Sequence, residues 1–101
     1  MKNIKDANIF RQNEGPEKRS VGLTLHDDGS IEMHTHDDGP TALQTWGKEE
    51  YEFWTNIPPD AVSLLAFVLL RERYLGHDSA TDELSKLCKE NAVPHKWESY
   101  P

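Results

Sequence analysis

The sequence is poor in cysteine and has no long hydrophobic run. Its only cysteine is Cys88, so no disulfide can form within the 101-residue chain. The longest apolar run, residues 64–70, is followed directly by Arg71 and is far shorter than the ~20 residues of a membrane-spanning helix. Residues 1–6 lack the apolar stretch of a secretory signal. We therefore expect a cytoplasmic protein that does not enter a membrane.

Positive charge is also scarce. The chain has 11 Lys and Arg residues against 18 Asp and Glu residues, which gives a formal net charge of −7 at pH 7. A folded domain of this charge repels phosphate backbones, so we expect no nucleic-acid partner. The same charge would steer the chain towards a basic protein partner. Three Trp, three Tyr and three Phe residues supply large apolar side chains, so we expect the chain to fold.

A β-hairpin is the clearest pattern. Alternating apolar residues flank the turn Asp27-Asp28-Gly29: they are Val21, Leu23, Leu25, Ile31 and Met33. Such alternation is typical of half-buried strands. A three-residue loop pairs Leu25 with Ile31, whereas a two-residue loop would set Leu25 opposite Glu32. The three-residue loop is a type I turn with a G1 bulge, which favours glycine at its last position, and Gly29 is there.

Two further strands are expected after the hairpin. The third is predicted over residues 42–46 and the fourth over residues 50–57, where apolar and polar side chains alternate again. A two-residue and a three-residue connection would place Trp46 on opposite faces, so the register of strand 42–46 stays open. Before the hairpin, residues 1–19 are mostly polar and are expected to form a flexible N-terminal arm.

Two helices are expected in the C-terminal part. The first begins at the Pro58-Pro59-Asp60 sequence and runs to about Leu75 before Gly76. Its middle is apolar nearly all the way round, so this helix, 61–75, should be covered on more than one side. The second begins at Asp78 or Ser79 and ends near Asn91. Residues 95–100 can then form a short strand at a sheet edge, because Pro94 lacks a backbone donor.

Together these elements predict a single α+β domain over residues 20–101. We expect an antiparallel β-meander of three or four strands, with two C-terminal helices packed on one face and a short terminal edge strand. The apolar face that the helices should cover carries Val21, Leu23, Leu25, Ile31, Met33, Tyr51, Phe53 and Ile57.

The residues with reactive side chains do not form a recognisable catalytic set. Cys88 shares a helical stripe with Leu84 and Leu87, which is typical of a small core side chain rather than a nucleophile. The sequence contains no nucleophile elbow, no phosphate-binding loop and no dinucleotide fingerprint. The two Asp-Asp-Gly sequences are explained by turn chemistry. We therefore expect neither catalysis nor a cofactor.

Two histidines offer an alternative. His34 and His36 lie two residues apart on a strand, so both leave the same face and could supply two ligands to zinc. Zinc usually takes three or four protein ligands, and His26 is too far along the hairpin to join them. An exposed polar sheet face explains the pair more simply. A metal-binding protein using His34 and His36 is kept as an alternative function.

Trp54 is the most informative aromatic residue. It lies on the face of its strand opposite to Phe53, and is either open to solvent or covered by Ile9 and Phe10 of the arm. If it is open, it would centre a contact surface made of Trp54, Glu52, His34, Glu32 and His36. We expect a small acidic protein-interaction module of the inhibitor, immunity or adaptor type, with no catalytic activity. A homodimer or larger homo-oligomer formed through the apolar 61–75 helix is a further alternative.

Overall fold

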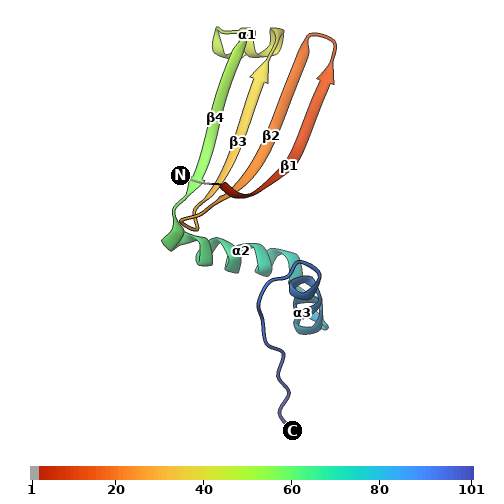
Figure 1. Cartoon of the computed structure of the whole chain (residues 1–101). Helices are drawn as coiled ribbons and strands as arrows, with labels where there is room; N and C mark the ends of the chain where they lie inside the picture. Colours follow the sequence, from red (N-terminus) through yellow and green to blue (C-terminus); the bar gives the residue numbers. More distant parts are fainter. Residues whose placement is uncertain (1–2) are drawn as a thin grey trace. The chain divides into compact units, whose positions relative to one another are not determined.

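The computed structural model describes residues 3–101, which form two compact units that divide between Ala66 and Phe67. The first unit contains a four-stranded antiparallel sheet with strand order β1-β2-β3-β4 (Figure 1). Each strand therefore pairs with its neighbour in the sequence, which is the meander that the sequence predicts. The α+β class is confirmed. The packing of the two C-terminal helices on the sheet stays a prediction.

The central hairpin has the predicted register. Strand β2 spans Glu17–His26 and β3 spans Ile31–Asp38. Leu25 lies opposite Ile31 and Leu23 lies opposite Met33. The Gly29 N–H donates to the His26 carbonyl and the His26 N–H donates to the Ser30 carbonyl, each at 3.0 Å. Gly29 has φ +90°, a conformation that costs glycine little and other residues more. The three-residue loop is thus confirmed.

The N-terminal segment differs from the prediction. Of the residues expected to form a flexible arm, 1–19, residues 1–2 lie outside the described part of the chain. The others instead contribute strand β1, Asn3–Glu14, and the start of β2. The ladder between β1 and β2 shifts register at two places, which leaves Ile4 and Ile9 as extra residues. Each extra residue breaks the period-two alternation by which a strand is recognised. The apolar residues of β1 therefore do not show a strand pattern in the sequence.

The predicted third strand over residues 42–46 is wrong, because these residues form helix α1, Pro40–Trp46. Proline in the first turn suits a helix start, since its missing N–H has no partner there. At the other end the Gly47 N–H donates to the Leu43 carbonyl at 2.9 Å. Because residues 42–46 are helical, they have no strand register to assign. Strand β4, Glu50–Ile57, has the predicted bounds and pairs directly with β3.

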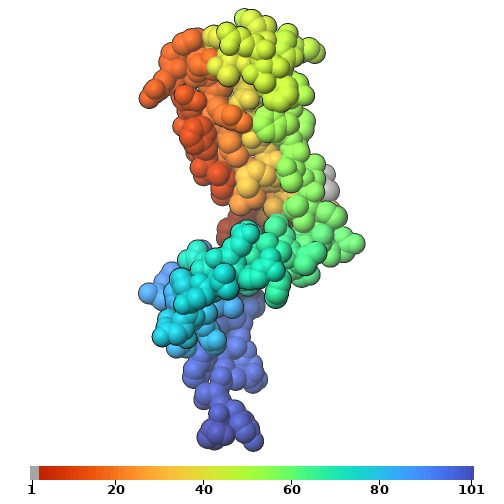
Figure 2. Space-filling view, turned by 180° about the vertical axis from the view of Figure 1, so that it is seen from behind, coloured from red at the N-terminus to blue at the C-terminus, as the bar shows by residue number. Residues whose placement is uncertain are grey.

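Helix α1 is fixed to the turn between β1 and β2. The Thr41 N–H and hydroxyl both donate to Oε1 of Glu17, at 2.8 and 2.7 Å. Figure 2 shows this turn and α1 beside each other at one end of the sheet. The buried side chains of the unit are Ala42, which is 3% exposed, and Thr35, which is 7% exposed. The best-buried part of the first unit therefore lies near α1.

The apolar face has the predicted composition. Opposite residues of the four strands follow one another across it, as in the row Ala7, Leu23, Met33 and Thr55. Near α1, Trp46 stacks on Tyr51 with ring centroids 4.3 Å apart. The Arg19 guanidinium lies 5.8 Å from the Phe53 ring centroid. Further along the face, Met33 is 38% exposed, about as much as Phe53 at 37%.

The helical part matches the prediction up to its last residues. A 3₁₀ turn, η1 (Pro59–Ala61), leads into α2 (Val62–Tyr74), and α3 (Ala80–Glu90) ends at Asn91. The predicted terminal strand over residues 95–100 is wrong, because these residues have no regular structure. Trp97 instead donates its indole N–H to the Asp82 carboxylate of α3 at 3.1 Å. The tail is therefore attached to α3 by a side chain and not to a sheet by its backbone.

Candidate functional site

The five residues predicted to form a contact surface lie on one face of β3 and β4. His34 is opposite Trp54, His36 is opposite Glu52, and Glu32 lies on the same side of β3 as both histidines. We call this side of the sheet the polar face. The antiparallel register brings the five side chains together because directly opposite residues leave a sheet on the same side.

Trp54 and His34 form the centre of this surface. Their rings are stacked with centroids 4.8 Å apart and planes 7° from parallel. Trp54 is 50% exposed. Ile9 and Phe10 do not cover it, because β1 is at the opposite edge of the sheet from β4. Of the two alternatives predicted for Trp54, exposure to solvent is therefore the one observed.

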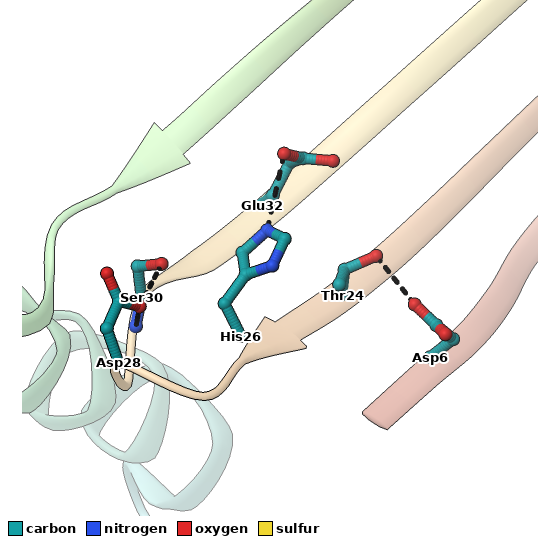
Figure 3. Close-up of polar contacts among 6 residues, drawn as sticks. All are labelled: Asp6, Thr24, His26, Asp28, Ser30 and Glu32. Atoms are coloured by element: carbon teal, nitrogen blue, oxygen red, sulfur yellow. Dashed lines mark hydrogen bonds and ion pairs between the residues drawn. The ribbon is translucent and has the colours of Figure 1, made fainter. Parts of the chain in front are cut away.

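Carboxylates flank the stacked pair. Glu52 Oε1 lies 3.5 Å from His34 Nε2. Figure 3 shows the second pair, in which Glu32 Oε1 lies 3.4 Å from His26 Nε2. Neither β3 nor β4 contains a Lys or Arg residue. On the half of the polar face formed by β3 and β4, histidine is therefore the only basic residue type that the strands contain.

His26 belongs to this surface although the sequence interpretation set it apart. It lies opposite Ser30, and its ring reaches diagonally to Glu32, two residues further along β3. Diagonal neighbours in an antiparallel pair are within reach of long and aromatic side chains. The hairpin register, which the sequence predicts, is therefore enough to place His26 close to Glu32. The distance from His34 excludes His26 only from a shared metal site, whereas Glu32 lies within its reach.

The polar face continues across β2 to β1. Thr24 Oγ1 donates to Asp6 Oδ1 at 2.9 Å (Figure 3). Nearer α1, a hollow is lined by side chains of three strands, among them Arg11, Lys18, His36 and Asp38. Its cations come from β1 and β2, whereas its one carboxylate, that of Asp38, comes from β3. The sequence interpretation missed Arg11 because β1 was not recognised as a strand.

A second hollow adjoins Trp54. Its lining side chains come from β4 and from residues just before and beside it, and they are His36, Lys48, Glu50, Tyr51, Glu52 and Trp54. Three of the predicted contact residues, Trp54, Glu52 and His36, therefore border one concavity. An aromatic ring beside carboxylates can hold a cationic side chain by ring contact and ion pairing together.

Within residues 3–101, the one clearly shifted pKa belongs to Asp28, in the turn at the other end of the polar face. Asp28 Oδ1 accepts hydrogen bonds from the Ser30 hydroxyl at 2.6 Å and from the Ser30 N–H at 2.9 Å (Figure 3). These bonds favour the charged carboxylate and lower the pKa of Asp28, the hydroxyl contributing most. Asp28 therefore stays ionised to lower pH than an ordinary aspartate.

The alternative metal site remains a pair of histidines. His34 and His36 leave the same face of β3, as predicted. Within residues 3–101, no group of three or more His, Cys, Asp and Glu side chains is arranged to hold a metal ion. Cys88 is a free, half-buried thiol on α3.

No helix in the described part of the chain has both the length and the hydrophobicity to cross a lipid bilayer. Comparisons of the chain with protein-family models, with curated proteins and with solved structures gave no match.

Proposed function

We propose that this chain is a small, non-catalytic protein-interaction module that binds a basic partner through the β3–β4 half of its polar face. One observation supports this more than any other. Trp54 is half exposed, held flat against His34, and bordered by carboxylates. Tryptophan is enriched among the residues that contribute most to protein–protein binding. A rigid, exposed tryptophan also loses little conformational entropy on binding.

The chemistry around Trp54 favours a cationic partner. The side chains of Glu32, Glu50 and Glu52 share the polar face of two strands that carry no Lys or Arg. A Lys or Arg side chain could lie over the indole ring while it pairs with a neighbouring carboxylate. The net charge of −7 adds a long-range attraction for the same kind of partner. An inhibitor, an immunity protein or an adaptor would use such a surface.

A comparative capture experiment tests the proposal. The wild-type chain, Trp54→Ala and Glu52→Lys would be used to retain proteins from a lysate of the native organism at low salt, with quantitative mass spectrometry. We expect a stoichiometric basic partner on the wild type, and about tenfold or greater loss of it on both variants, as for a hot-spot residue. Circular dichroism would show that the variants keep their fold.

Trp97→Ala is the matched control, because Trp97 is similarly exposed at 55% but lies in the other unit. It should retain the partner as the wild type does. If no stoichiometric partner is found, or if Trp54→Ala retains it fully, the proposal is wrong.

A homo-oligomer is the second candidate function, and the exposure of apolar side chains on α2 favours it. Leu64 is 66% exposed, Phe67 is 61% exposed and Leu69 is 54% exposed. Exposed apolar surface of this kind often marks an interface. Sedimentation velocity over a wide concentration range shows whether the chain self-associates. A single monomeric species at high concentration would exclude this candidate.

A further inference from the structure

The sheet has two outer strands, β1 and β4, each paired on one side only within residues 3–101. An unpaired strand edge carries a row of backbone donors and acceptors that can pair with a strand from another protein. Proteins commonly protect such edges with bulges and charged side chains. The two edges of this sheet differ in that respect, and the difference indicates which one is available.

The β1 edge is irregular. Its ladder with β2 shifts register beside Ile4 and again beside Ile9, and bulges of this kind disturb the straight edge that an added strand needs. The β4 edge is regular, because all eight residues from Glu50 to Ile57 pair with β3 in a single register. Six of those eight residues are exposed. The β4 edge is therefore the better template for an added strand.

The backbone groups that face outwards on β4 can be identified. The Gly39 N–H donates to the Glu49 carbonyl at 2.8 Å, so Glu49 directs its carbonyl towards β3. In an antiparallel ladder this direction alternates along the strand, so Tyr51, Phe53 and Thr55 also direct their backbone groups towards β3. The residues between them direct their N–H and C=O groups away from the sheet: Glu50, Glu52, Trp54 and Asn56.

We infer that β4 is a docking edge to which the basic partner adds one strand, and that cationic and apolar residues alternate along that strand. This inference rests on the proposed function and specifies how the partner binds. Residues of the added strand opposite Glu50, Glu52 and Trp54 would lie on the polar face, where a cationic side chain pairs with the carboxylates and the indole. Residues between them would lie on the apolar face beside Tyr51 and Phe53. Main-chain hydrogen bonds would supply affinity and the alternation would supply specificity.

A synthetic peptide of the length of β4, in which lysine and valine alternate, provides the probe. Backbone amide exchange of the full chain would be followed by NMR with and without saturating peptide. We expect exchange at Glu52, Trp54 and Asn56 to slow at least tenfold when the peptide is bound. The amides of Tyr51, Phe53 and Thr55 should be protected in both states, because they already bond to β3.

Two further measurements separate pairing at the edge from contact with the face. Asn56→Pro removes an outward N–H without removing a bond to β3, since proline is tolerated at the solvent side of edge strands. It should weaken peptide binding about tenfold. Asn13→Pro makes the same change at an outward position on β1 and should leave binding within about twofold. A peptide N-methylated on the residues that face β4 should not bind the wild type.

The outcomes distinguish this inference from the proposed function. If the peptide shifts the Trp54 indole resonance while the outward amides of β4 stay unprotected, strand addition is wrong and the polar face still binds cations. If those amides become protected without peptide as protein concentration rises, the edge binds a second copy of the chain and the inference is overturned. Loss of both peptide binding and Trp54-dependent capture would remove the proposed function as well.

Discussion

Asp28 stabilises the β2–β3 turn through hydrogen bonds that are stronger when its carboxylate is charged. The hydroxyl and the N–H of Ser30 both donate to Oδ1, and they lower the pKa of Asp28 below the ordinary value. A carboxylate with a lowered pKa in the folded state contributes stability that is present above the unfolded pKa, about 3.9. That contribution is lost as the pH falls through the lower folded pKa.

We therefore expect Ser30→Ala to raise the pKa of Asp28 towards its ordinary value, because the hydroxyl bond is the largest cause of the shift. Carbon-detected NMR titration of the carboxyl would measure this directly. Thermal melts should show Ser30→Ala less stable than the wild type at neutral pH, with the difference shrinking below about pH 4. An Asp28 pKa that is the same in both proteins would contradict this account of the turn.

The alternation of side chains between the two faces of a strand explains which parts of the site were predictable from the sequence. Placing His34 and Trp54 on one face needs only the period of two along each strand, which holds. Their direct pairing was not predicted, because a strand over residues 42–46 was expected between their two strands. The parallel stacking of their rings is a rotamer choice that no spacing specifies. Arg11 shows a different limit. Its position on the polar face depends on a strand that the sequence pattern did not reveal.

The start of helix α1 depends on Gly39, whose φ is +134°. A Cβ at this position would collide with the carbonyl oxygen of Pro16 in the β1–β2 turn. We expect Gly39→Ala to lower the free energy of unfolding by about 2–4 kcal/mol, from backbone strain and the collision together. Gly47→Ala is the matched control, because its φ is +79° but a Cβ there meets nothing within 4 Å.

Gly47→Ala should cost only about 1–2 kcal/mol, the strain of a left-handed residue alone. Urea denaturation followed by circular dichroism measures both values. Equal losses for the two variants would mean that the contact between Gly39 and the β1–β2 turn does not matter for stability.

At the level of whole elements, sequence prediction succeeded where a regular pattern coincided with turn chemistry. The hairpin around Gly29 and the strand ending at Ile57 both had such a pattern, and both are correct.

Strand β1 was missed because Ile4 and Ile9 interrupt its alternation. Residues 42–46 were assigned to a strand although Pro40 and Gly47 suit the two ends of a short helix. The tail after Pro94 has strand-forming residues but pairs with no strand among the described residues.

At the scale of the whole molecule, the net charge of −7 affects the two candidate functions in opposite ways. Two copies of this chain repel each other, and dissolved salt screens that repulsion. Self-association through the apolar surface of α2 should therefore strengthen as salt is added. A basic partner is attracted by the same charge, so its binding should weaken as salt is added. The direction of the salt dependence consequently distinguishes a homo-oligomer from a module for a basic partner.

We expect the dissociation constant of the lysine–valine peptide to rise roughly tenfold between ~0.05 M and ~0.5 M salt, measured by isothermal titration calorimetry. Glu52→Gln should reduce this dependence, because it removes a carboxylate beside the Trp54 ring. Glu72→Gln changes the net charge equally but lies on α2, and it should have little effect. Sedimentation velocity at the same salt concentrations would report self-association in parallel.

If Glu72→Gln and Glu52→Gln change binding equally, the partner responds to the overall charge and not to the surface around Trp54. Binding that is insensitive to salt, together with self-association that grows with it, would instead favour the homo-oligomer.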